Sequence, residues 1–202
     1  MESYRLEGQT FVIDDYDRKP AFSSFLPGLA GVKGIPLWTF YTNRGQGMNS
    51  FGIDNKGNAI MEFNSANTAF ENTQVKGFRT FLKIDGEYYE PFFTYEKEAK
   101  RQMRMNKNSF KIIETNEKYG IEVTVNYYVL PNESIGALVR QVSVKNIGDS
   151  AKEVQVIDGL PKIITYGIAN GEFKEMSNLF KSWADIRNLE NKVPYYTLRA
   201  ST

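Results

Sequence analysis

The residue types that most enzymes use for chemistry are sparse in this chain. Its 202 residues include no histidine and no cysteine. Without histidine the chain lacks the commonest general base and transition-metal ligand, and it cannot build a Ser-His-Asp triad by itself. Without cysteine it has no disulfides, thiolate zinc sites or cysteine nucleophiles, which fits a reducing cytoplasm.

Acidic residues are the remaining candidates for catalysis. Two carboxylates at the right separation can hydrolyse a glycosidic bond, but sequence does not show which of the 24 acidic residues would face each other. The densest acidic cluster, Asp14-Asp15-Tyr16-Asp17, does not have the spacing of a calcium loop. We interpret it as a solvated turn, and we predict no catalytic residue, no metal site and no cofactor in this chain.

A glycine-rich loop is the first candidate binding site. The strand-like run Leu37–Tyr41 leads to a segment that contains Asn43, Arg44, Gly45, Gln46, Gly47 and Ser50. The segment lacks the third glycine and the following helix of a dinucleotide-binding loop. Its glycines would allow positive φ angles or a close backbone approach. Asn43, Arg44 and Gln46 could then bond to sugar hydroxyls or to a facing chain; the alternative is a simple hairpin turn.

Aromatic residues are the second candidate. Trp38, Tyr88 and Tyr89 belong to strand-like segments, and further aromatic residues follow at Phe92 and Phe93. Exposed rings on a strand could form a platform on which a sugar stacks. The alternative is that the same rings fill the core or an interface.

Period-two alternation predicts the strands that must position these residues. The clearest strand is Ile121–Val129, in which every second residue is apolar. The segments Phe78–Ile84 and Glu87–Tyr89 flank an Asp-Gly pair, and this pattern predicts a β-hairpin. Many short strands of this kind indicate an antiparallel arrangement.

A charged residue interrupts the apolar face of the next strand. Arg140 lies in phase with apolar residues of the predicted strand Ile135–Lys145. We predict a β-bulge near Val139, because a bulge would switch the face and keep Arg140 out of the core. A turn at 146–150 then leads to a predicted returning strand at Glu153–Ile157.

One late segment has the helical period instead. Seven apolar residues between Phe173 and Leu189 recur at steps of three and four. They predict one amphipathic helix that packs on a sheet and buries Trp183; docking on another domain or subunit is the alternative. The whole pattern predicts a mostly β fold, an antiparallel β-sandwich with one late α-helix, in a single domain over residues 1–202.

Charge and hydropathy restrict the partners. The 25 basic residues nearly balance the 24 acidic ones, so the chain lacks the positive field that attracts nucleic acid. No run of 18 apolar residues predicts a transmembrane helix, and the first residues do not resemble a signal peptide. We therefore predict a cytoplasmic protein with neither nucleic acid nor a membrane as partner.

Two stretches resemble glycoside hydrolase family 94, the cellobiose phosphorylases and their relatives. "FYTNRGQGMNSF" is similar to a strand, loop and strand near the family's start, and the matching positions are Asn43, Gly45, Gly47, Ser50 and Phe51. "VRQVSVKNIGDSAKEVQVIDGLPKIITYGI" (Val139–Ile168) resembles a family hairpin in which a strand ends in Val-x-Asn-x-Gly/Ser and another returns. Its Asp-Gly-Leu-Pro continuation is like the branch that acts on β-1,2-linked glucans.

The resemblance implies that this chain is the N-terminal β-sandwich domain, of the galactose-mutarotase supersandwich type, of a much longer enzyme. It implies that the chain is cut before the last strands of that domain. In such enzymes a helical linker and an (α/α)6 barrel follow, and the barrel holds the general-acid aspartate and the phosphate-binding residues. The implied reaction is reversible phosphorolysis of a β-glucoside or β-glucan, with inorganic phosphate as co-substrate and a sugar 1-phosphate as product.

The resemblance also implies partners for this chain. They are the downstream barrel of the same parent chain and a second subunit of a homodimer, whose active site the loop at 43–47 would help to wall. The competing hypothesis is a free-standing carbohydrate-binding module that uses Trp38, Tyr88 or Tyr89. A self-contained hydrolase is the third and weakest hypothesis.

Overall fold

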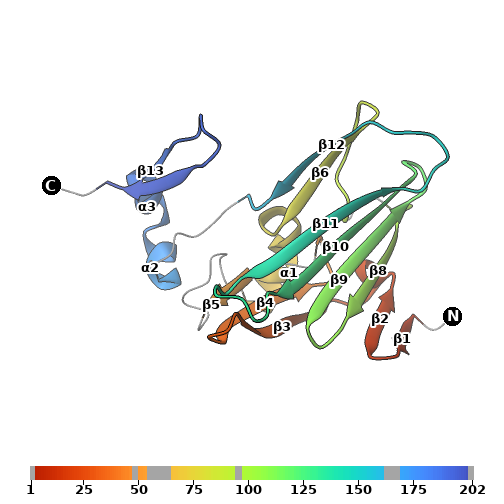
Figure 1. Cartoon of the computed structure of the whole chain (residues 1–202), viewed down its shortest axis with the longest axis horizontal. Helices are drawn as coiled ribbons and strands as arrows, with labels where there is room; N and C mark the ends of the chain where they lie inside the picture. Colours follow the sequence, from red (N-terminus) through yellow and green to blue (C-terminus); the bar gives the residue numbers. More distant parts are fainter. Residues whose placement is uncertain (1–2, 47–49, 54–64, 94–96, 162–168, 200–202) are drawn as a thin grey trace.

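A six-stranded antiparallel sheet is the largest element of the computed structural model, which describes residues 3–46, 50–53, 65–93, 97–161 and 169–199. Its strand order is β1-β2-β8-β9-β10-β11 (Figure 1). The strands are β1 (Tyr4–Glu7), β2 (Thr10–Asp14), β8 (Lys100–Met105), β9 (Ser109–Asn116), β10 (Ile121–Val129) and β11 (Leu138–Asn146).

Alternation fixes which face of this sheet is buried. In β10 the side chains of Ile121, Val123, Val125 and Tyr127 are buried, whereas those between them are half-buried. Successive side chains of a strand point to opposite faces, so the apolar set must face the core. The strand that the sequence predicted over Ile121–Val129 is confirmed, with the same bounds.

Two smaller sheets cover the apolar face of the six-stranded sheet. One has the order β12-β6-β7 and the other β3-β4-β5. Their strands are β12 (Val154–Gly159), β6 (Arg79–Ile84), β7 (Glu87–Tyr89), β3 (Ser23–Ala30), β4 (Ile35–Thr42) and β5 (Ser50–Ile53). Leu82 and Tyr41 from these sheets share one core with Phe110 and Val125, and the Tyr41 and Phe110 rings stack with centroids 4.2 Å apart. The fold is therefore a mostly β, antiparallel sandwich, as predicted.

The hairpin between β6 and β7 is also confirmed. Leu82 pairs with Tyr89 and Ile84 with Glu87, which leaves Asp85 and Gly86 as the two-residue loop. Both loop residues have positive φ, 49° and 92°. A tight hairpin of this kind requires such angles, and Asp-Gly adopts them readily.

The predicted bulge near Val139 is wrong. β10 and β11 pair without interruption from Ile121 opposite Asn146 to Val129 opposite Leu138. Arg140 therefore lies directly opposite Tyr127, on the inner face. The interior accommodates its charge through an acidic partner described below, so no switch of face is needed.

The returning strand is likewise placed differently from the prediction. β12 does not pair back onto β11 but crosses to the opposite layer and pairs with β6 from Val154 opposite Ile84 to Gly159 opposite Arg79. The segment between Asn146 and Val154 thus joins the two layers of the sandwich.

The predicted helix over Phe173–Leu189 is wrong in its extent. The segment forms α2 (Asn170–Glu175), α3 (Ser177–Trp183) and β13 (Ala184–Arg187), and β13 pairs with β14 (Tyr195–Leu198). The backbone leaves helical geometry at Met176, where φ is −115° and ψ is 23°. We call residues 169–199 the C-terminal unit. Figure 1 shows it beside the sandwich rather than across either face.

Two further helical elements were not predicted. They are the 3-10 turn η1 (Tyr16–Arg18) and α1 (Ala66–Lys76). Among the side chains of α1 that the structure describes, the buried ones are the small Ala69 and Thr73, so the helix lacks the wide apolar stripe that identifies an amphipathic helix. Among the described residues, none of these helices combines the length and the apolar character that crossing a bilayer requires.

Candidate functional site

The described part of the glycine-rich loop, residues 43–46, is largely buried instead of opening to solvent. Asn43 is fully buried, and its Oδ1 accepts a hydrogen bond from the Phe22 N–H at 3.1 Å. Its Nδ2 donates to the carbonyl oxygens of Tyr16 and Lys19, each at 3.1 Å. Asn43 therefore links the loop to η1 and to the residues that follow η1, and its side-chain amide is not available to bind a sugar.

Arg44 and Gly45 hold the loop between η1 and α1. Arg44 Nη1 donates to the carbonyl of Asp17 at 3.1 Å, and its guanidinium lies 4.8 Å from the centre of the Phe70 ring. Gly45 has a φ of 56°, and a Cβ added there would lie 3.1 Å from the Cα of Gln74. The glycine is thus required for a close approach to α1. Gly47 lies outside the described residues, and Ser50 begins β5 opposite Phe40.

Gln46 connects this loop to a group of polar side chains around Arg140. Its Nε2 donates to Thr80 Oγ1 at 2.9 Å, and its Oε1 accepts from Arg140 Nη2. Arg140 also donates from Nε to the Tyr127 hydroxyl at 3.1 Å, and from Nη1 to the Asp158 carboxylate. We call Gln46, Thr80, Tyr127, Arg140 and Asp158 the Arg140 cluster. It joins the glycine-rich loop to both layers of the sandwich.

The Arg140 cluster is buried at its centre and reaches the surface at one side chain. The side chain of Arg140 is 8% exposed and that of Asp158 is 29% exposed. The Arg140 guanidinium lies 4.9 Å from the Phe78 ring centre and 5.8 Å from that of Tyr127. Burial raises the pKa of Tyr127 to about 12, although the nearby guanidinium opposes this. The phenol therefore stays protonated at neutral pH.

Asp158 borders a hollow of about 230 Å3 that also contacts Phe81, Ile157 and Leu160. Its carboxylate faces Thr80 and Arg140, on the opposite side of β12 from Ile157, and accepts from Thr80 Oγ1 at 2.6 Å and from Arg140 Nη1. Thr80 is fully buried, so the hydroxyl that it donates to Asp158 is not accessible to a substrate.

A second ion cluster is sealed inside the sandwich. Arg101 Nε lies 2.6 Å from Glu114 Oε2, and both side chains are at most 1% exposed. Glu114 also accepts hydrogen bonds from the Phe92 N–H at 2.7 Å and from the Tyr89 hydroxyl. Burial raises the pKa of Glu114, and the Arg101 charge opposes that rise. We call Asp17, Tyr89, Arg101 and Glu114 the Arg101 cluster.

This cluster corrects the interpretation of the acidic run at 14–17. Asp17 is not a solvated residue: its carboxylate accepts from Arg101 Nη1 at 2.7 Å and is 14% exposed. Asp15 lies in the left-handed region, with a φ of 48°. In the described parts of the chain no three acidic side chains gather in a way that could hold a metal ion.

The three aromatic candidates do not form one platform. Tyr88 is 81% exposed and Tyr89 only 7% exposed, since neighbouring residues of β7 point to opposite faces. The Tyr89 ring belongs to the core and to the Arg101 cluster. Trp38 lies in β4 opposite Pro27 and Gly52, and its side chain is outside the description. Tyr88 is the one ring of the three that is shown at the surface.

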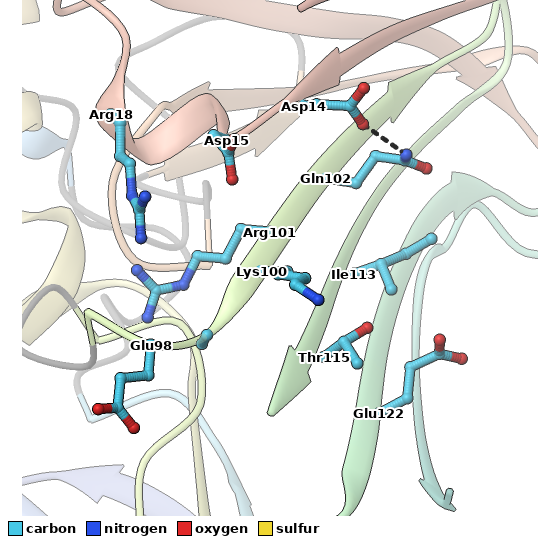
Figure 2. A pocket seen from close by; sticks show the side chains of 11 residues that line it. Asp14, Asp15, Arg18, Glu98, Lys100, Arg101, Gln102, Ile113, Thr115 and Glu122 are labelled. Carbon is cyan, nitrogen blue, oxygen red and sulfur yellow. Dashed lines mark hydrogen bonds between the residues drawn. The ribbon is translucent and has the colours of Figure 1, made fainter. Parts of the chain in front are cut away.

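A larger polar hollow, of about 640 Å3, lies over β8, β9 and β10. Figure 2 shows Asp14 accepting a hydrogen bond from Gln102 at its upper side, with Lys100, Thr115 and Glu122 on the strands below. Asp14 is also paired with Arg5, and Lys100 lies 2.6 Å from Glu117. Much of the charge here is therefore already compensated within the chain.

The sequence did not identify the Arg140 cluster as a site. One signal for it was present, because Arg140 lies in phase with the apolar residues of β11. A charge on an apolar face indicates either a bulge or a buried partner, and the partner Asp158 could not be recognised before β12 was placed beside β6.

Comparison of the chain with models of protein families gives no match, and neither does comparison with curated proteins.

Proposed function

We propose that this chain is a non-catalytic, carbohydrate-associated β-sandwich domain of a glycoside phosphorylase similar to family 94. The parent enzyme would use inorganic phosphate to release a sugar 1-phosphate from a disaccharide or a β-1,2-oligoglucan. The domain would support a downstream (α/α)6 barrel and contribute to a homodimer in which it faces the partner's active site.

One observation carries the proposal: the two stretches that resemble the family meet in space. Gln46 belongs to the first stretch, and Arg140 and Asp158 belong to the second. Gln46 and Arg140 lie 94 positions apart in sequence, yet they are hydrogen-bonded in the Arg140 cluster. Two distant segments that each resemble one family thus contribute residues to one polar centre, whose Asp158 carboxylate is partly exposed.

The internal pairing of polar groups supports the non-catalytic role. Arg140 is bonded to Asp158, and Arg101 to Glu114 and Asp17. A general acid or base has to reach the substrate, whereas Glu114 of the Arg101 cluster is sealed from solvent.

Phosphate-dependent release of glucose 1-phosphate from cellobiose, laminaribiose and sophorose tests the proposal. The chain alone should release none, and a longer protein in which the barrel follows the chain should release it in proportion to the disaccharide consumed. Release by the chain alone, unchanged through further purification, would contradict the non-catalytic role. A parent protein without such a barrel would contradict the assignment to a phosphorylase.

The high exposure of Tyr88 favours a second candidate, a free-standing carbohydrate-binding module. Calorimetric titration with soluble β-glucans separates the two. The phosphorylase proposal expects no binding by the chain alone at an affinity of about 1 mM or better. Binding in that range that is lost in Tyr88→Ala but kept in Tyr4→Ala, a second exposed tyrosine, would favour the module.

A further inference from the structure

The two ion clusters are connected by an unbroken series of short contacts. We infer that Asp17 and Arg101 are positioning residues for the Arg140 cluster: they fix η1, η1 fixes the loop at 43–46, and the loop places Gln46 on Arg140. The inference concerns geometry within this chain and holds whether or not the phosphorylase activity is found.

The first step is the attachment of η1 to the core. Arg101 is held by Glu114 at 2.6 Å and donates from Nη2 to the carbonyl of Phe93 at 2.8 Å. Its remaining terminal nitrogen, Nη1, donates to the Asp17 carboxylate at 2.7 Å. The Asp15 N–H adds a bond to the Arg101 carbonyl at 2.7 Å. One buried guanidinium, fixed on two sides by the sandwich, therefore holds η1 on its third.

The second step is the attachment of the loop to η1. Asn43 Nδ2 donates to the Tyr16 carbonyl at 3.1 Å, and Arg44 Nη1 donates to the Asp17 carbonyl at 3.1 Å. The Tyr16 hydroxyl donates to the Gly45 carbonyl at 3.3 Å. Three consecutive loop residues are thus bonded to two consecutive residues of η1, so a displacement of η1 would have to displace the loop.

The third step is the placement of Gln46, the next residue of the chain. Gln46 is 3% exposed and bridges Thr80 of β6 and Arg140 of β11. Its Oε1 is one of four acceptors of the Arg140 guanidinium, beside Tyr127, Thr80 and Asp158. If Gln46 moves away, Arg140 loses one of these bonds and Asp158 loses part of what fixes its orientation at the surface.

Exchange of the Arg140 Nε–H proton with solvent, followed by NMR on the chain, tests the inference, because hydrogen-bonded buried protons exchange through opening of the structure. In Asp17→Asn the charge that holds η1 is removed with little change in shape. We expect this variant to speed exchange at Arg140 Nε by about tenfold or more. Arg79 Nε, bonded to Glu90 at 2.8 Å outside the series, reports general loosening and should change much less.

Glu90→Gln is the matched control. It should speed exchange at Arg79 Nε and leave Arg140 Nε as in the wild type. Equal acceleration at Arg79 and Arg140 in Asp17→Asn would show general destabilisation and overturn the inference, as would no acceleration at Arg140. If Asp17→Asn does not fold, Arg44→Met removes the donor to the Asp17 carbonyl, together with the cation–π contact on Phe70. Exchange at Arg140 Nε and Arg79 Nε is then compared in this variant, with the same outcomes supporting or overturning the inference.

Discussion

Apolar side chains that recur with a regular period are buried in the sandwich but largely exposed in the C-terminal unit. In the sandwich, Phe110 and Val125 are at most 1% exposed because two layers face each other. In the C-terminal unit, Trp183 is 37% exposed and Ile186 64%, although they belong to an equally regular apolar stripe. Periodicity states which side chains share a face, but burial depends on whether another element lies opposite that face.

The two regions also differ in how they use charge. The Arg101–Glu114 pair is sealed in the sandwich, whereas the Asp185–Arg199 pair of the C-terminal unit lies at the surface, with the Arg199 side chain 64% exposed. An ion pair in water contributes little to stability, while a buried one cannot lose a partner without leaving an uncompensated charge. Disruption should therefore be far more costly in the sandwich.

The largest expected effect is that of Glu114→Ala. Removal of this carboxylate leaves the buried Arg101 without its closest acceptor, and we expect the free energy of unfolding to fall by about 3–5 kcal/mol. Asp185→Ala is the matched truncation in the C-terminal unit and should change the same quantity much less, because its ion pair with Arg199 lies in water. Urea denaturation measures both. Equal losses would remove the distinction between the two regions.

A pair of aromatic truncations sharpens the same comparison. Phe110→Ala should lower the free energy of unfolding by about 3–5 kcal/mol, because it opens a cavity in the core. Trp183 contacts Phe180 edge-to-face at 5.7 Å within its own unit, so Trp183→Ala should cost about 1 kcal/mol or less. The cost would be much larger if the apolar stripe of residues 173–189 packed on a sheet, as the sequence predicted. A urea midpoint for Trp183→Ala as low as that of Phe110→Ala would show that the unit is part of the sandwich core.

A substitution in the glycine-rich loop should have a smaller effect within the sandwich. Gly45→Ala places a Cβ 3.1 Å from Gln74 Cα at a φ of 56°, so we expect both backbone strain and displacement of α1, at a cost of about 1–3 kcal/mol. Gly8 has a similar φ of 62° with no atom within 4 Å of an added Cβ, so Gly8→Ala should show the strain alone. The difference between the two thermal midpoints measures the contact with α1, and identical midpoints would show that the loop does not press on it.

The smallest expected effect is in acid. Arg5 and Arg104 lower the pKa of Glu7 on the sandwich, and Arg199 lowers that of Asp185 in the C-terminal unit. Each carboxylate therefore stabilises the folded state above its unfolded pKa, and this contribution is lost as the pH falls through the lowered folded value. Glu7→Gln should slightly flatten the acid dependence of sandwich unfolding between pH ~5 and ~3. Asp185→Asn should leave it unchanged if the two regions are independent, and a matching change would link them.

Much of the fold followed from local pattern, and most of the candidate site did not. The alternation of Ile121–Val129 and the Asp85-Gly86 turn each depend on neighbouring residues, so both were predictable. The end of the helical segment at Trp183 depends on the pairing of β13 with β14, and the burial of Asn43 depends on η1. Arg140 was noticed but explained wrongly, because its partner Asp158 reaches it only through the crossing of β12 to the other layer.

That crossing also constrains the order in which the molecule can assemble. The bond between Thr80 and Asp158 closes a loop of 78 positions, while β6 and β7 meet across a two-residue turn. During synthesis at about 5–20 residues per second, β6 would wait roughly 4–16 s for its second neighbour to emerge. Until then its edge would be open to other chains, so the growing chain should be most prone to aggregation in this interval.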